Sequence, residues 1–243
     1  MAEKSRMFPF ITTTWNPLGG ACPHQCVYCW SMSKKGLVNR YNMKKYQGPI
    51  RLIKKELDRK FKPEEFVFVC DMLDLFAEKV PARLIREILS RIRRFPKTKF
   101  LLQTKNPRGY VPFLAFNEIP RNAILGATIE TDMLLFNTPS TLENYYEVSG
   151  AVPPSRRLIS MQRISEAHTH HRLFISVEPI LDFTEDFVEQ IRMIKPWAVA
   201  VGYDNYGHRL PEPPLEKTLR LIEELERFTT VYRKTLRKAW WEK

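Results

Sequence analysis

The sequence predicts an α/β fold, a partial (βα)6 TIM-like barrel with parallel strands. Apolar runs of strand length alternate with stretches that have the apolar spacing of amphipathic helices. The alternation repeats six times, which is typical of a parallel sheet that closes fully or partly into a barrel. The 9 glycines among 243 residues are about half the usual share, so we expect short connections. These observations favour one domain over residues 1–243, with a doubly wound open sheet as the competing arrangement.

The expected strands are rich in β-branched and aromatic residues. They are Phe10–Thr14, Phe66–Cys70, Lys99–Gln103, Ile124–Thr128, Arg172–Val177 and Trp197–Gly202. A final edge strand over Thr229–Lys234 is compatible with the pattern.

The expected helices have apolar residues on one face and charged residues on the other. They are Pro49–Phe61, Pro81–Phe95, Thr184–Ile194 and Pro214–Phe228. Proline and serine punctuation predicts a long loop over Phe136–Pro154, followed by a helix through Ile164.

The charge balance is basic, because 39 lysines and arginines exceed 27 aspartates and glutamates and give a net charge of +12. Such a charge attracts nucleic acid or other anions, although a generic basic surface explains it equally well. No apolar run approaches the ~18 residues of a membrane-spanning helix, and Met1–Phe10 lacks the apolar core of a secretory signal. We therefore expect a cytoplasmic protein without a membrane partner.

The tail over residues 229–243 interleaves basic and aromatic residues. That composition suits backbone contacts and base stacking on single-stranded nucleic acid. A tail that is frayed, or one that covers an edge, is the alternative.

Reactive side chains follow five of the expected strands. The pairs and triplets are Cys70-Asp71, Thr104-Lys105, Thr128-Ile129-Glu130, Ser176-Val177-Glu178 and Tyr203-Asp204. Since chemistry in parallel barrels takes place at the carboxyl ends of the strands, we expect one site there. Glu130 and Glu178 alone would also suit an ordinary barrel hydrolase.

A cysteine loop follows the first strand, where Cys22, Cys26 and Cys29 have the spacing C-x3-C-x2-C and Tyr28 precedes the third cysteine. Thiolates bind both zinc and iron–sulfur clusters. A structural zinc needs four closed ligands, whereas three cysteines leave one iron of a [4Fe–4S] cluster open. The loop therefore favours a [4Fe–4S] cluster, with zinc or a purely structural cluster as the alternative.

This motif, at this place in an α/β chain, resembles that of the radical S-adenosylmethionine (SAM) superfamily, whose fold is a full or partial (βα) barrel. The resemblance implies that Cys22, Cys26 and Cys29 hold a [4Fe–4S] cluster whose open iron chelates SAM. It implies reductive cleavage of SAM to a 5′-deoxyadenosyl radical, with the electron supplied by an external one-electron reductant.

Three stretches, Gly20–Trp30, Phe66–Asp74 and Phe100–Asn106, resemble spore photoproduct lyase and, more closely, its uncharacterised phage-associated relatives. The resemblance implies that Cys70 returns hydrogen to the product radical and that Lys105 pairs with the SAM carboxylate. As an alternative, Cys70 is a small buried hydrophobe.

Many superfamily members bind the SAM amino group through a Gly-Gly-Glu that this chain lacks, so backbone carbonyls, Asp71 or Asp74 would replace it. The stretches Gly126–Glu130 and Ser176–Pro179 resemble the phage-type relatives. The expected cofactor-binding set is completed by Tyr28, Thr128, Glu130, Ser176 and Glu178.

The predicted function is that of a radical SAM enzyme acting on an unknown substrate, with nucleic acid favoured by the charge and by the resemblance. The alternative is a non-catalytic, metal-stabilised protein that binds nucleic acid.

Overall fold

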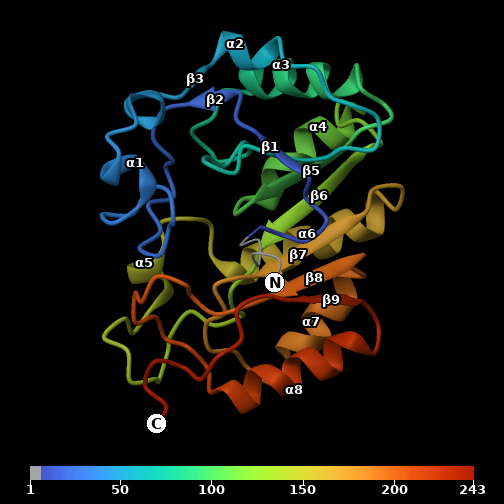
Figure 1. The fold of residues 1–243 in the computed structure, drawn as a ribbon. Helices are drawn as coiled ribbons and strands as arrows, with labels where there is room; N and C mark the ends of the chain where they lie inside the picture. The colour runs from blue at the N-terminus through green and yellow to red at the C-terminus, as the bar shows by residue number, and fades with distance from the viewer. Residues whose placement is uncertain (1–6) are drawn as a thin grey trace, which may run out of the picture.

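The computed structural model describes residues 7–243; the predicted domain limits include residues 1–6, which lie outside the described part. Within residues 7–243, seven parallel strands form one curled sheet in the order β1-β4-β5-β6-β7-β8-β9 (Figure 1). Their bounds are β1 Thr13–Trp15, β4 Phe66–Val69, β5 Lys99–Thr104, β6 Ala123–Thr128, β7 Leu173–Val177, β8 Ala198–Val201 and β9 Thr230–Arg233. The curl leaves a half-barrel, which confirms the predicted partial barrel.

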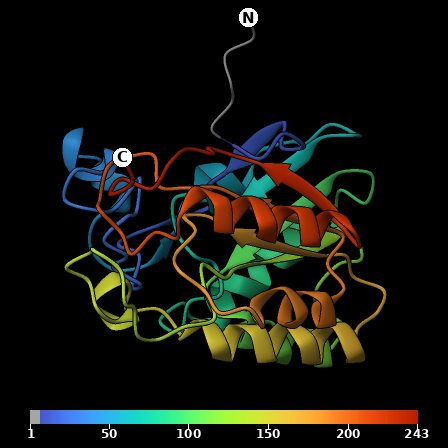
Figure 2. The same cartoon turned by 90° about the horizontal axis from the view of Figure 1, so that it is seen from below.

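The longer helices lie on the outer side of this sheet (Figures 1 and 2). They are α3 Ala82–Arg93, α6 Pro154–Ala167, α7 Phe187–Ile194 and α8 Leu215–Glu226. Shorter elements, which lie in the connections, are α1 Leu37–Arg40, η1 Lys44–Tyr46, α2 Lys54–Leu57, η2 Pro107–Tyr110, α4 Val111–Ala115 and α5 Tyr145–Val148. The four longer helices confirm the helices predicted after Pro81, Pro154, Thr184 and Pro214.

Each central strand divides its side chains between the two faces of the sheet, because successive side chains alternate. Phe100 and Leu102 of β5 belong to the large core beneath the helices, whereas Leu101 belongs to a second cluster on the concave face. On β7, Ile175 packs toward the helices and Phe174 packs toward the concave side. The concave face of the sheet therefore has a hydrophobic cluster of its own, separate from the core beneath the helices.

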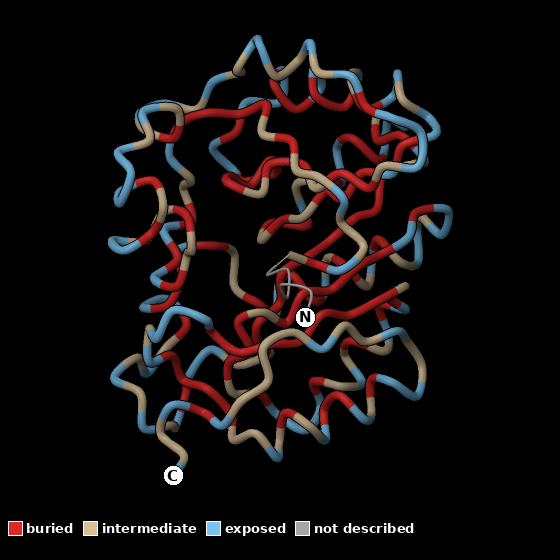
Figure 3. The backbone as a smooth tube through the Cα atoms, viewed as in Figure 1, coloured by how far each residue is buried: buried red, intermediate tan, exposed pale blue. Residues whose placement is uncertain are grey.

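The segment before β1 packs into the concave face. The ring centroid of Phe8 lies 4.8 Å from that of Phe174, and that of Phe10 lies 5.1 Å from that of Tyr232. The ammonium of Lys234 donates to the carbonyl of Met7 over 2.8 Å. The strands β6, β7 and β8 are buried along their whole length (Figure 3). The aromatic segment therefore covers part of the concave face of the half-barrel.

The helix predicted over Pro49–Phe61 is wrong. Arg51–Leu52 forms strand β3, which pairs antiparallel with β2 Leu18–Gly19, and only Lys54–Leu57 is helical. The indole of Trp15 donates to the carbonyl of Glu56, which ties this segment to β1. The apolar spacing is used for packing, but tertiary contacts override the helical periodicity.

The first strand also begins later than predicted, at Thr13 instead of Phe10. Phe10 makes ring contacts on the concave face instead. The edge strand suggested at the C-terminal end is present, since β9 pairs parallel with β8. Within the described residues, no helix is both long and apolar enough to cross a membrane.

Candidate functional site

A cavity of about 570 Å³ opens at the carboxyl ends of the central strands, within the range of ~300–1,000 Å³ typical of ligand pockets. Most of the predicted site residues line it, namely Cys22, Cys26, Cys29, Cys70, Asp71, Asp74, Lys105, Thr128, Ser176 and Glu178. The other two, Tyr28 and Glu130, are buried and do not line the cavity.

The cysteine loop is held by backbone hydrogen bonds to the segment after α5. The amide of Val27 donates to the carbonyl of Val148, and the amide of Gly150 donates to the carbonyl of His24. At the start of the loop Gly20 has a φ of +105°, and a Cβ there would lie 2.5 Å from the carbonyl oxygen of Pro49. Glycine is therefore required at Gly20, both for its backbone conformation and for this close approach.

The thiols of the loop have hydrogen-bonding partners of their own. Cys26 Sγ lies 3.0 Å from Ser149 Oγ, and the amide of Met32 donates to Cys29 Sγ over 3.2 Å. Burial raises the pKa of Cys22 to about 12 and also raises the pKa of Cys26. A bound metal centre would reverse that preference, because ligating thiols lose their protons to the metal charge.

The donor set fits an iron–sulfur cluster. Three cysteine thiols from one loop line one side of the cavity, and hydrogen bonds to sulfur are a normal part of such sites. Among residues 7–243, no three His, Cys, Asp or Glu side chains meet the geometry for a single metal ion.

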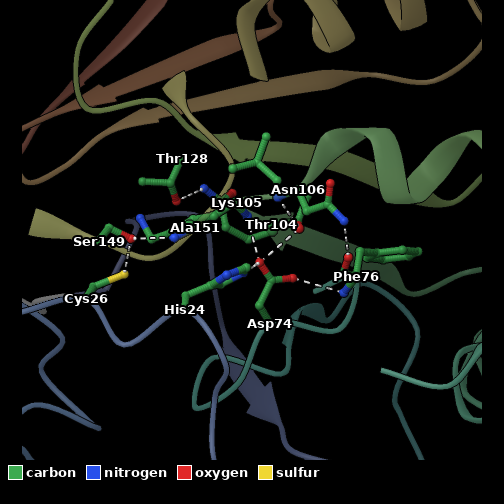
Figure 4. A network of polar contacts seen from close by, with 12 residues as sticks. His24, Cys26, Asp74, Phe76, Thr104, Lys105, Asn106, Thr128, Ser149 and Ala151 are labelled. Atoms are coloured by element: carbon green, nitrogen blue, oxygen red, sulfur yellow. Dashed lines mark hydrogen bonds and ion pairs between the residues drawn. The ribbon is translucent and has the colours of Figure 1, made fainter. Parts of the chain in front are cut away.

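Asp74 fastens the cysteine loop to the ends of β4 and β5 (Figure 4). Its Oδ2 accepts hydrogen bonds from His24 Nε2 at 2.7 Å, from Thr104 Oγ1 at 2.9 Å and from the Lys105 amide at 2.7 Å. Burial alone would raise the pKa of Asp74, but these hydrogen bonds lower it. The carboxylate therefore joins three segments that are distant in the sequence.

Glu130 forms a second buried centre behind Lys105. Its carboxylate pairs with the Lys105 ammonium at 2.6 Å and with the Arg157 guanidinium at 2.7 Å. The hydroxyls of Tyr28 and Tyr145 also donate to it. Burial would raise the pKa of Glu130, yet the charges of Arg157 and Lys105 lower it well below its usual range.

Two of the predicted cofactor-binding residues, Tyr28 and Glu130, belong to this buried centre. Tyr28 and Glu130 contact each other, and the ring of Tyr28 lies under the Lys105 ammonium at 5.1 Å. Only Lys105 of these three reaches the cavity. Two cations against one carboxylate leave one positive charge in excess beside the cavity, with Arg157 buried and Lys105 partly accessible.

Cys70 follows β4 with a left-handed backbone, at a φ of +59°. It packs in the core and also lines the cavity, and burial raises the pKa of its thiol well above the usual value. Such a backbone conformation is unusual for a residue other than glycine and occurs often at functional sites. Asp71 lies beside it and accepts a hydrogen bond from the side chain of Asn16.

The middle strands add a row of polar side chains to the cavity. Thr128 of β6 and Ser176 of β7 are register partners, and Gln103 Nε2 of β5 donates to Thr128 Oγ1 over 2.9 Å. The other amide atom of Gln103, Oε1, is buried and has no hydrogen-bond partner among the described residues. Glu178 continues this row two residues beyond Ser176.

Sequence reasoning did not single out Gln103 or Arg157. Gln103 interrupts the apolar run of its strand at a cavity-facing position, and that interruption was a usable signal. Arg157 lies on an amphipathic helix among exposed basic residues, so its burial could not be recognised from the pattern.

The C-terminal tail packs on the loop after β8. The Arg237 guanidinium pairs with the Glu212 carboxylate at 2.6 Å, and the indole nitrogens of Trp240 and Trp241 donate to the carbonyls of Leu210 and Glu212. The contacts therefore hold the tail against this loop, and the predicted contact of the tail with nucleic acid stays a prediction.

The same fold occurs in solved structures of spore photoproduct lyase. A mutant lyase with bound AdoMet and dinucleoside spore photoproduct aligns with a TM-score of 0.53 at 14% sequence identity. A second lyase mutant aligns with a TM-score of 0.53 at 13% identity. In both, the alignment covers 93% of this chain and 65% of the lyase chain.

In sequence, no curated protein matches the chain. A family model does match, over residues 6–220, and its description is "Protein of unknown function (DUF5131)". Because the match spans most of the chain, the protein belongs to the DUF5131 family.

Proposed function

We propose that this protein is a radical SAM enzyme. The observation that carries the proposal is the meeting of three loop thiols and a partly accessible lysine ammonium at one cavity, at the carboxyl ends of a parallel half-barrel. Cys22, Cys26 and Cys29 would hold a [4Fe–4S] cluster, which when bound supplies the electron that cleaves SAM reductively. The fold shared with a lyase whose structure contains AdoMet supports this assignment.

The side chains near the loop suit the polar parts of SAM. Lys105 brings an excess positive charge to the cavity, where a carboxylate would pair with it in a partly desolvated setting. Asp71 is an acceptor for an ammonium group on the same side, since it lines the cavity and is held by Asn16. Asp74 is already saturated by four hydrogen bonds, so its role is to hold the loop.

Cys70 is the proposed donor of a hydrogen atom to the product radical. Cys70 lines the cavity directly after β4, the strand that pairs with β1, and β1 precedes the loop that would hold the cluster. Burial keeps the thiol protonated, which is the form that has a hydrogen atom to donate.

For the substrate we propose a nucleic acid. The net charge of +12 favours encounter with a polyanion. Lys35 and Arg40 line the cavity on the side of the cysteine loop, where phosphates at its mouth would meet them.

Anaerobic reconstitution tests the proposal. Protein loaded with iron and sulfide should contain about four iron atoms per chain, and after reduction by dithionite it should convert SAM to 5′-deoxyadenosine. A variant with Cys22, Cys26 and Cys29 all changed to alanine is the matched control and should do neither. Protein that binds zinc, lacks iron and leaves SAM intact would instead be a metal-stabilised binding protein.

A further inference from the structure

The end of the cavity between β7 and β9 differs chemically from the cysteine end. Glu178 projects there from the end of β7, half-buried and lining the cavity. Among the described residues, burial and the charge of Lys234 act on its carboxylate, and no hydrogen bond does. A carboxylate with so little compensation is costly in the protein interior, and burial raises the pKa of Glu178 to about 7.

Glu178 is also remote from the cysteine loop along the sheet. The loop follows β1 at one edge, and β7 is the fifth strand from that edge. Four strand spacings of about 4.8 Å separate them along the curled sheet. The charge that acts on Glu178 is that of Lys234, at the far edge strand.

Lys234 reaches this end because Gly202 makes room for it. A Cβ at Gly202 would lie 2.6 Å from the Cβ of Lys234. The Lys234 ammonium donates to the Met7 carbonyl, and it acts on Glu178 through its charge and not through a hydrogen bond. The carboxylate therefore keeps its acceptor capacity for a group inside the cavity.

Aromatic rings border the same part of the cavity. Phe8 lines the cavity, and its ring lies against that of Phe174 on β7, with the ring centroids 4.8 Å apart. Tyr203 and Tyr206 line it from the loop after β8. Of the two carboxylates there, that of Asp204 is paired with His208 at 2.9 Å, whereas that of Glu178 is left for a ligand. Aromatic walls beside such a carboxylate match a planar group that has N–H donors at its edge.

We propose that the β7–β9 end of the cavity is the substrate subsite and that Glu178 is its specificity-determining residue, accepting hydrogen bonds from a planar, N–H-bearing group. This assigns Glu178 to the substrate, whereas the sequence predicted a contact with the cofactor. That the bound group is the substrate rests on the proposed function. Its binding by Glu178 requires neither SAM nor a cluster.

Benzamidine is a suitable probe, because it is planar and carries paired N–H donors that match a carboxylate. Its binding to the reconstituted protein at pH 8 can be measured by calorimetry and by saturation-transfer NMR, with benzoate as the anionic counterpart. We expect benzamidine to bind and benzoate not to bind. Glu178→Gln should weaken benzamidine binding about tenfold or more, whereas Glu185→Gln, at an exposed position seven residues later, should not change it.

Several outcomes would overturn the proposal: no benzamidine binding to the wild-type protein, equal binding by Glu178→Gln, or displacement of benzamidine by saturating SAM. Displacement would place Glu178 in the cofactor site. Simultaneous binding of SAM and benzamidine supports two separate subsites. If the protein neither takes up iron nor cleaves SAM, the proposed function fails, while the benzamidine measurements still decide the role of Glu178.

Discussion

At the cysteine end of the cavity, Asp74 and Glu130 accept hydrogen bonds from side chains on several elements. At the β7–β9 end, no hydrogen bond from the described residues acts on Glu178. All three carboxylates come from the carboxyl ends of parallel strands, so their place in the fold does not explain the difference. The difference lies in the side chains that surround each carboxylate.

Asp74 and Glu130 hold parts of the protein together, whereas the carboxylate of Glu178 is available to a ligand. Burial of a charge is tolerated when opposite charges and hydrogen bonds compensate it, as at Glu130. Without such compensation the carboxylate destabilises the folded state. A group kept under that penalty in a cavity is a candidate for ligand contact.

Loss of a cluster ligand should have the largest effect. Replacing Cys26 with alanine is expected to lower the iron content after reconstitution more than tenfold, about to background, and to abolish 5′-deoxyadenosine formation, since two thiols do not hold the cluster. Iron analysis and chromatography of the products measure both. Cys70→Ala is the matched control for iron uptake, and an equal loss of iron in that variant would contradict the assignment of ligands.

Removal of one partner from the Glu130 centre should cost stability. Arg157→Leu leaves a buried carboxylate with one cation fewer and is expected to lower the free energy of unfolding by about 3–5 kcal/mol. Urea denaturation measures the loss. The double variant Glu130→Leu/Arg157→Leu should lose less than the sum of the two single variants, and strict additivity would refute the coupling.

At the β7–β9 end of the cavity, removal of the Glu178 charge should stabilise the protein, whereas Arg157→Leu should destabilise it. The pKa of Glu178 is raised from 4.5 to about 7 in the folded protein, so the contribution of Glu178 to stability becomes less favourable as the pH rises from about 4.5 to about 7. Glu178→Gln is therefore expected to raise the free energy of unfolding by about 3 kcal/mol at pH 8 and to leave it nearly unchanged at pH 4.

Denaturation of Glu178→Gln and of Glu185→Gln at both pH values checks this expectation. A destabilised Glu178→Gln variant at pH 8 would mean that the carboxylate has compensating partners after all, and the contrast between the two ends would disappear.

An exposed ion pair provides the reference for the two expected changes in the free energy of unfolding, those of Arg157→Leu and Glu178→Gln. Arg220 and Glu216 are exposed and lie four residues apart on α8, with 2.8 Å between the guanidinium and the carboxylate. Arg220→Ala should change the free energy of unfolding by at most about 0.5 kcal/mol. A loss comparable to that of Arg157→Leu would show that burial is not what distinguishes the two arginines.

The strands and the position of the site could be predicted because their signals are local. The apolar run of Phe66–Val69 and the reactive residues after it follow one another in the sequence. The cysteine spacing is local as well. The helix predicted over Pro49–Phe61 failed because Trp15 and the strand at Leu18–Gly19 contact that segment from elsewhere in the chain.

The partners of the ionisable groups could not be predicted. Asp74 and His24 are 50 residues apart, and Glu130 and Arg157 are 27 residues apart. Nothing in either local sequence indicates which charges meet. For the same reason, the difference between Glu130 and Glu178 became visible only in three dimensions.

The most direct test of the central claim is electron paramagnetic resonance of the reconstituted, reduced protein with and without SAM. If three cysteines hold a cluster with an open iron beside Lys105, the reduced protein has a [4Fe–4S]⁺ signal, and SAM shifts that signal. A spectrum without an iron–sulfur signal, or one that SAM leaves unchanged, would contradict the assignment of the cysteine end to this cofactor pair.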